Sequence, residues 1–137
     1  MARGMELLVS DWIKTVWNEG RLDSLERYHP RIWRDNGRQI SVEEAIAWHR
    51  QMRDTYPDLV YEIDEIVSAG ERCTVRWTAR GTHVGTLWGQ LPGTGQTLSW
   101  RGLHLLRIAG GVIEEIWAVA DIGAVLQQLN ARVSLPK

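Results

Sequence analysis

An acidic residue and a histidine lie where apolar strand patterns place them against a hydrophobic wall. Asp121 closes the apolar run 112–119 and has the parity of Trp117, while His104 has the parity of Trp100. Alternate residues of a β-strand point to the same face of the sheet. We therefore expect a carboxyl group and an imidazole on apolar strand faces, unless a β-bulge shifts the parity by one position.

Such a pair is suited to proton transfer. An apolar wall disfavours the charged form of a carboxyl group, so we expect a raised pKa for Asp121. A carboxyl group with a raised pKa can act as a general acid or base near neutral pH. His104 could share its proton or stabilise a developing enolate oxygen. These residues favour proton transfer next to a carbonyl group.

Structural roles explain the same residues. Asp121 directly precedes a predicted helix, and Asp is a favoured N-cap residue. His104 could be a core histidine with one nitrogen satisfied. His83 has the parity of Trp77 but lies near a turn, where it could be exposed.

The aromatic composition is unusual, with eight tryptophans, three tyrosines and no phenylalanine. The tryptophans could fill the core, or several could line a cavity for a flat hydrophobic ligand. His49 lies on the inner stripe of a predicted helix and could face the same cavity. The candidate substrate contacts are Trp33, His49, Trp77, His83, Trp100 and Trp117.

Other chemistries find little support in the sequence. The four histidines, at positions 29, 49, 83 and 104, lack a tight metal-ligand spacing, and Cys73 is the single cysteine. The glycines of residues 81–95 join strand to strand, unlike those of a dinucleotide-binding motif. The net charge of −1 predicts no nucleic-acid or anionic-membrane partner. No segment is long and apolar enough to span a bilayer, and residues 1–6 lack a signal-peptide core, so we expect a cytoplasmic protein.

Helical periodicity dominates the first part of the chain. Apolar residues from Met5 to Trp17 repeat every three or four positions, which predicts one helix that ends near Gly20. A short helix is expected around residues 22–28, and residues 32–34 read as a short edge strand. Ser41 and Glu44 predict a capping box and a third helix that ends at about residue 56.

Period-two alternation takes over after Asp58 and predicts four strands joined mainly by short glycine turns, then a final helix after Asp121. On the last strand, Ile113, Trp117 and Val119 are expected to share the inner face. Helices followed by a meander of strands indicate an α+β fold. We expect one domain over residues 1–137, with a core over about 5–130. A strongly curved antiparallel sheet would wrap the helices and leave a pocket between them.

Several stretches together resemble the SnoaL-like polyketide cyclases. They are Tyr56-Pro57-Asp58-Leu59, residues 81–85, residues 89–95, residues 111–117, Asp121 and residues 127–129. The resemblance implies the cone-shaped α+β fold of nuclear transport factor 2 and ketosteroid isomerase, without metal or cofactor. It also implies an acid/base Asp at the end of the last strand, which matches Asp121, and a pocket histidine that matches His104.

The resemblance implies a cyclase that closes a ring of a hydrophobic, polyketide-derived substrate by an intramolecular aldol step. The same fold also hosts cofactor-free hydroxylation, isomerisation and epoxide hydrolysis, and it can serve as a non-catalytic binding or dimerisation module. Related sheets pair through their outer face, so we expect a homodimer or homotetramer. Antibiotic biosynthesis is the implied setting.

Overall fold

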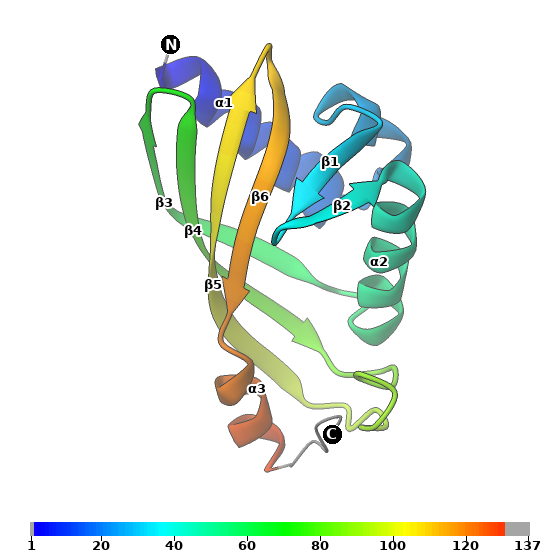
Figure 1. Ribbon diagram of the computed structural model, residues 1–137. Coiled ribbons are helices and arrows are strands. Elements are labelled where there is room, and N and C mark those ends of the chain that lie inside the picture. Colours follow the sequence, from blue (N-terminus) through cyan, green and yellow to red (C-terminus); the bar gives the residue numbers. More distant parts are fainter. Residues whose placement is uncertain (1, 131–137) are drawn as a thin grey trace.

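The computed structural model describes residues 2–130, which form helices packed in the concavity of one curved sheet (Figure 1). The N-terminal helical part consists of α1 (Ala2–Trp12), the π-helix η1 (Ile13–Asn18) and the 3₁₀-helix η2 (Leu22–Arg27). A short hairpin, β1 (Ile32–Asp35) and β2 (Arg38–Ser41), leads into α2 (Val42–Thr55). The α+β class predicted from the sequence is confirmed.

Four long strands build most of the sheet: β3 (Val60–Ala69), β4 (Arg72–Thr82), β5 (Thr97–Ala109) and β6 (Val112–Ala120). The strand order is β2-β1-β6-β5-β4-β3. All neighbours pair antiparallel except β1 and β6, which run parallel, so the sheet is mixed and not purely antiparallel as expected. Helix α3 (Ile122–Leu129) follows β6 and packs near one end of β5 (Figure 1).

The sequence explains the two-residue turn between β5 and β6. Gly110 and Gly111 have φ angles of +59° and +78°. Two consecutive left-handed residues form the turn type whose twist matches a β-hairpin, and glycine adopts that conformation without steric cost. This turn places β6 beside the second part of β5, from Gly102 to Ala109.

A β-bulge on β6 overturns the predicted faces of that strand. The register shifts between the pairs Arg107–Glu115 and Ile108–Ile113, so the parity changes after Ile113. Ile116 is buried as a result, whereas Trp117 is 46% exposed. The expectation that Trp117 and Val119 face inward with Ile113 is therefore wrong. A second register shift, between Ile63 and Glu65 on β3, has the same effect there.

The predicted first helix changes its winding at Trp12, where the α-helix passes into η1. The guanidinium group of Arg53 on α2 fixes the end of η1 by donating to the carbonyl oxygens of Trp17 and Asn18, the latter at 2.6 Å. It also donates to the carbonyl of Leu59 at 2.9 Å. One side chain thus ties η1 to α2 and to the segment that enters β3.

The predicted capping box begins α2. The Ser41 side chain accepts a hydrogen bond from the backbone N–H of Glu44, and the Glu44 carboxylate accepts one from the backbone N–H of Ser41. Each group satisfies a backbone donor that the first helical turn leaves free. The box fixes where α2 leaves β2 and therefore which side of α2 faces the sheet.

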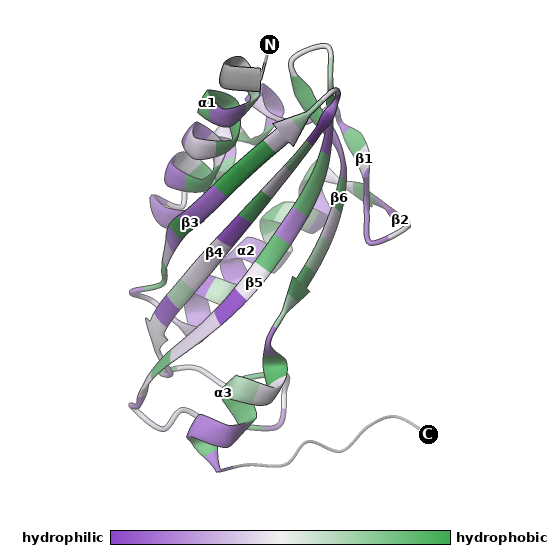
Figure 2. Ribbon diagram, turned by 90° about the vertical axis from the view of Figure 1, so that its left-hand side faces the viewer, coloured by the Kyte–Doolittle hydropathy of each residue, from purple (hydrophilic) through white to green (hydrophobic). Residues whose placement is uncertain are grey.

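Figure 2 looks onto the outer face of the long strands, with α2 lying behind the sheet. The core lies on the concave side, where inward residues of β4 and β5 meet α1 and η1. Within residues 2–130, no helix is long and apolar enough to cross a membrane.

Candidate active site

A cavity of about 840 Å³ lies between α2, the N-terminal helices and the concave face of the sheet. Its volume is in the range of small-molecule sites. Every tryptophan of the chain except Trp117 lines it: Trp12, Trp17, Trp33, Trp48, Trp77, Trp88 and Trp100. Indole rings present wide apolar faces with one donor each. The walls of the cavity therefore suit a largely apolar molecule.

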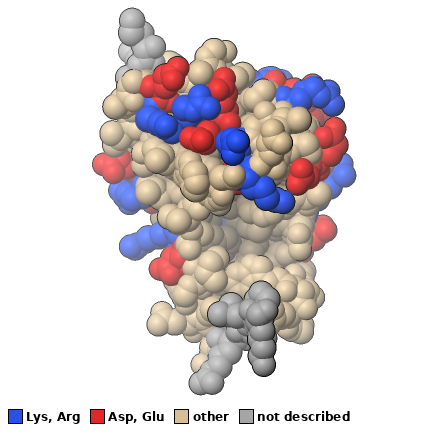
Figure 3. Space-filling model, viewed as in Figure 1, with Lys and Arg blue, Asp and Glu red and all other residues tan. Residues whose placement is uncertain are grey.

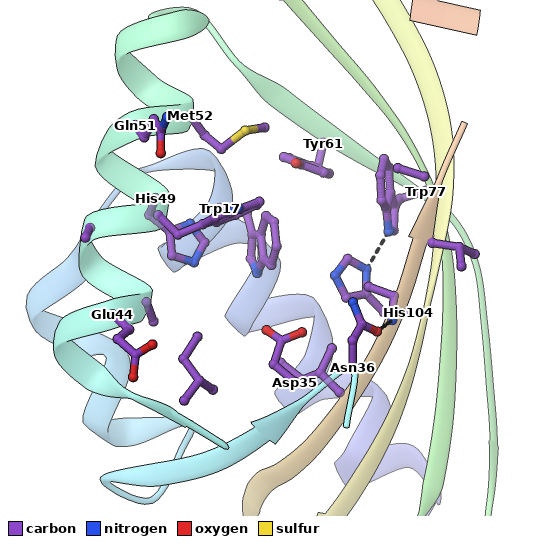
Figure 4. A pocket seen from close by; sticks show the side chains of 18 of the residues that line it. Trp17, Asp35, Asn36, Glu44, His49, Gln51, Met52, Tyr61, Trp77 and His104 are labelled. Atoms are coloured by element: carbon purple, nitrogen blue, oxygen red, sulfur yellow. Dashed lines mark hydrogen bonds between the residues drawn. The ribbon is translucent and has the colours of Figure 1, made fainter. Parts of the chain in front are cut away.

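His104 on β5 lies on the cavity wall, as its parity predicted, and is only 4% exposed. Trp77 Nε1 donates a hydrogen bond to His104 Nδ1 at 2.6 Å (Figure 4). An indole N–H can only donate, so Nδ1 accepts and the proton of the neutral ring lies on Nε2. Burial lowers the pKa of His104 to about 4. The residue is thus a neutral imidazole with an N–H donor that Trp77 does not use.

His29 is equally buried but has both ring nitrogens engaged. Trp12 Nε1 donates to its Nε2 at 3.1 Å, and its Nδ1 donates to the carbonyl of Ile113 at 3.0 Å. The ring stacks on Trp33 with 4.0 Å between centroids. Burial lowers the pKa of His29 to about 4. This histidine is a structural link between the helices and β6.

His49 on α2 lines the cavity opposite the sheet, with its ring 4.7 Å from that of Trp17 (Figure 4). Burial is the largest cause that lowers its pKa to about 3, with smaller contributions from its electrostatic interactions with His29, Arg53 and His104. The expectation that this histidine faces the cavity agrees with its position.

Asp121 does not lie on the cavity wall. Its side chain is exposed, and Oδ1 accepts a hydrogen bond from the backbone N–H of Ala124 at 3.0 Å, as the N-cap of α3. The bulge on β6 turned this position outward together with Trp117. Its chain neighbours Ala120 and Ile122 line the cavity, whereas Asp121 does not. The expected inward placement is wrong, and a catalytic role for Asp121 stays a prediction.

The other predicted contacts divide into two groups. Trp33, Trp77 and Trp100 are buried and line the cavity. His83 is fully buried but lies outside the cavity lining; its Nδ1 is 3.1 Å from Thr94 Oγ1 and its Nε2 is 3.2 Å from the Leu91 carbonyl. His83 therefore holds the loop between β4 and β5, and neither the exposed position nor the cavity position considered for it applies.

Asp35, an acidic residue that was not predicted from the sequence, lines the cavity at the end of β1. Burial raises its pKa, and the positive charge of Arg38 partly opposes this. The signal was present in the sequence, because Asp35 has the parity of Trp33 on the short edge strand. A four-residue strand is too short for an alternation pattern to identify it alone.

Charged side chains gather around one end of the molecule, over the ends of β5 and β6 near their turn and around the β1–β2 hairpin (Figure 3). The hollowed middle of the same face is mostly uncharged. Among residues 2–130, no group of three His, Cys, Asp or Glu side chains could hold a metal ion.

The family model for SnoaL-like polyketide cyclases matches residues 7–129. The chain belongs to this family. No curated protein sequence matches it. The fold is shared with solved structures such as TsrD from Streptomyces laurentii, at 23% identity, a TM-score of 0.84, and coverage of 95% of this chain and 97% of that one.

Two further structures show how the SnoaL-like fold recurs under different names. AclR, a putative hydroxylase from Streptomyces galilaeus, is 24% identical, with a TM-score of 0.82 and coverage of 100% of this chain and 91% of AclR. IdmH, a putative polyketide cyclase from Streptomyces antibioticus, is 22% identical, with a TM-score of 0.81 and coverage of 92% and 98%. At these identities the likeness establishes the fold of this SnoaL-like protein, while the reaction must be argued from its site.

Proposed function

We propose that this SnoaL-like protein is a cofactor-independent enzyme that closes a ring in a hydrophobic polycarbonyl compound by intramolecular aldol chemistry. The observation that carries the proposal is the neutral imidazole of His104 in the tryptophan-lined cavity, with Trp77 holding its Nδ1 as an acceptor. Family membership supports a polyketide-type substrate. The product then belongs to the chemistry of aromatic polyketides and secondary metabolism, including antibiotic biosynthesis.

His104 serves as the donor to a carbonyl oxygen of the substrate. Removal of a proton next to a carbonyl group moves negative charge onto that oxygen, and a fixed N–H donor in a site of low polarity stabilises this charge. A neutral donor suits the task, since its hydrogen bond strengthens as the enolate forms. The short contact from Trp77 keeps the donor in one tautomer.

The tryptophans supply the second part of the rate enhancement. A flexible polycarbonyl chain must fold so that the enolate carbon meets a second carbonyl carbon, and holding it in that shape removes an entropic barrier. Trp33, Trp77 and Trp100 form apolar walls on the sheet side, and His49 and Trp17 face them from the helices. The same walls exclude water from the reacting carbons.

The proposal is tested with poly-β-carbonyl anthraquinone esters and purified protein, without added metal or cofactor. We expect a product with the mass of the substrate, or that mass less one water. His104→Ala should lower kcat by about 10² to 10³, the usual effect of losing an oxyanion donor. His83→Gln is the matched control, because His83 lies buried outside the cavity. Equal loss in both variants, or no loss in His104→Ala, contradicts the proposal.

The same assay separates the other reactions that the fold hosts. Incorporation of labelled oxygen from O₂ would identify a cofactor-free hydroxylase, and incorporation from labelled water would identify an epoxide hydrolase. A shift of a double bond without ring closure would identify an isomerase. Binding without any change of the ligand would identify a non-catalytic module.

We also propose that the protein assembles as a homodimer or homotetramer through the outer face of its sheet, and that it works in the cytoplasm. The proposed assembly rests on the exposed apolar residues of β5 and β6. Asp121 remains the base that the family resemblance implies. Asp121→Asn tests this role directly. The exposed position of Asp121, at the N-cap of α3, supports the role less than a position inside the cavity would.

A further inference from the structure

We propose that Asp35, at the end of β1, is the group that takes up and returns the proton in this cavity. The inference rests on the proposed function, because it assigns the acid/base role of that reaction to a residue inside the cavity in place of Asp121. Asp35 lines the cavity with Trp33, two residues before it on the same strand face. Figure 4 shows its carboxylate pointing into the space between α2 and the sheet.

The carboxylate of Asp35 is free for a substrate. It is half-buried, and within residues 2–130 no hydrogen bond or ion pair engages it. Two other carboxylates are candidates for the base, but each already has a partner within the protein. Glu44 lines the cavity but belongs to the capping box of α2 and lies 3.8 Å from Arg38. Asp121 is exposed and caps α3.

The backbone around Asp35 is held firmly. Asp35 pairs with Arg38 across the β1–β2 hairpin and with Ile116 on β6. The next residue, Asn36, has a left-handed backbone with φ of +52°, which Asn tolerates better than most residues. Its N–H donates to the Ile116 carbonyl and its Oδ1 accepts from the Ala118 N–H, both at 2.8 Å. These bonds fix the strand end, and a fixed strand end positions a catalytic side chain well.

The surroundings suit a base that must also act as an acid. Burial raises the pKa of Asp35, and Arg38 is the nearby charge that opposes the shift. The other titratable groups that line the cavity are Glu44, the tyrosines at 56 and 61, and the histidines at 29, 49 and 104. The three histidines are neutral at neutral pH because burial lowers their pKa values. A carboxylate with a raised pKa is a stronger base than an exposed one.

The proton transfers balance within one cycle. The Asp35 carboxylate removes a proton from a carbon between two carbonyl groups, and the electrons of the broken C–H bond form an enolate. The enolate oxygen accepts a hydrogen bond from His104 Nε2–H. The enolate carbon then attacks a second carbonyl carbon, so one C–C bond forms and one C=O bond becomes an alkoxide. Asp35 returns its proton to the alkoxide, which leaves the enzyme unchanged.

The test uses 2-naphthol as a probe, since its hydroxyl group donates to a carboxylate as an enol does. Binding is followed by quenching of tryptophan fluorescence from pH 4 to 9. The wild-type affinity should fall about tenfold as pH drops through the titration of Asp35. Asp35→Asn should bind about tenfold more weakly at neutral pH and show no such step. Asp23→Asn, an exposed carboxylate on η2, is the matched control and should behave as wild type.

Carbon-13 NMR of the aspartate carboxyl groups gives a second reading that needs no ligand. The signal lost in Asp35→Asn should titrate above the ordinary Asp range in the wild type. An ordinary titration, or unchanged 2-naphthol binding in Asp35→Asn, overturns the inference. If Asp35→Asn does not fold, Asp35→Glu replaces it in the binding assay. A step in 2-naphthol affinity at a pH that differs from that of the wild type then supports the inference. Turnover that depends on His104 but not on Asp35 would overturn the inference about Asp35. The proposed function would still stand in that case.

Discussion

The two most buried histidines at the cavity differ in what their rings can still do. His29 has both nitrogens bonded within the protein, and His104 has one nitrogen left after Trp77. Because both rings sit in apolar surroundings, the folded protein holds them neutral. The same burial that prepares His104 as a donor therefore makes the fold sensitive to acid.

This sensitivity gives a prediction at the residue scale. The pKa values of His29 and His104 are about 4 in the folded protein, against an ordinary value of 6.5. Between pH 6.5 and 4 the unfolded chain binds protons that the folded chain does not, so the unfolding free energy should fall as pH drops through this window. Each histidine contributes a slope of about 1.4 kcal/mol per pH unit. Urea unfolding measured at several pH values checks this.

His104→Gln is the control for the pH dependence. Its unfolding free energy should depend less steeply on pH than that of the wild type, by the contribution of one histidine, about 1.4 kcal/mol per pH unit. A wild-type stability that stays constant from pH 6.5 to 4 would contradict the prediction.

Asp35 acts with the opposite sign, because its raised pKa makes the folded protein bind a proton more readily than the unfolded chain. Its contribution therefore favours the folded state at low pH and is lost as pH rises through its folded pKa.

At the scale of elements, the join between η1, α2 and β3 positions one side of the cavity. Arg53 donates to three backbone carbonyls from these segments. Asn18 adds two bonds to the backbone of Tyr61, as donor at 2.9 Å and as acceptor at 2.7 Å. Trp17 and Tyr61, whose rings lie 5.0 Å apart, are thereby held against the cavity.

Arg53→Lys should destabilise the protein by about 2–3 kcal/mol, because a lysine cannot reach three carbonyls with the planar fork of a guanidinium group. Chemical denaturation measures the effect. Arg50→Lys on the exposed side of the same helix is the matched control and should stay within about 0.5 kcal/mol of wild type. Similar stabilities for both variants would show that the carbonyl contacts of Arg53 contribute little.

At the scale of the whole molecule, the outer face of the sheet carries an apolar patch. Leu103 pairs across strands with Val119, and Leu105 pairs with Trp117. These four residues are 37%, 68%, 37% and 46% exposed, respectively. Neighbouring exposed apolar residues of this kind mark interaction surfaces. The outward turn of β6 after its bulge therefore exposes the surface that we propose for a second copy of the chain.

Leu105→Glu should shift the protein to a monomer, since a charge in the middle of the patch would be buried without a partner. Sedimentation equilibrium at several concentrations measures the mass. Leu7→Glu on α1 is the control, because Leu7 is 65% exposed but lies away from the patch. A wild-type protein that is already monomeric, or an assembly that survives Leu105→Glu, would rule out this interface.

Much of the architecture follows from local pattern. The capping box at Ser41 and Glu44, the alternation of β4 and the inward position of His104 were all predicted correctly, because each depends on residues a few positions apart. The patterns also place five of the cavity tryptophans on inner faces, namely Trp12, Trp17, Trp48, Trp77 and Trp100. Trp88 lies in a loop that no pattern covers, and Trp117 was expected inward but is exposed. Strand β2 and the cavity position of Asp35 were both missed, because they belong to a short hairpin whose pattern is too brief to interpret.

The sequence by itself determined the helices and the long strands, because periodicity and turn residues act over short distances. The tertiary structure decided which carboxylate faces the cavity. A bulge on β6 arises from pairing with β5 and turns Asp121 to the surface. Parallel pairing of β1 with β6 joins segments about eighty residues apart and brings Asp35 to the cavity wall. Register between distant strands is settled only when the whole sheet packs, and parity counted along one strand cannot anticipate it.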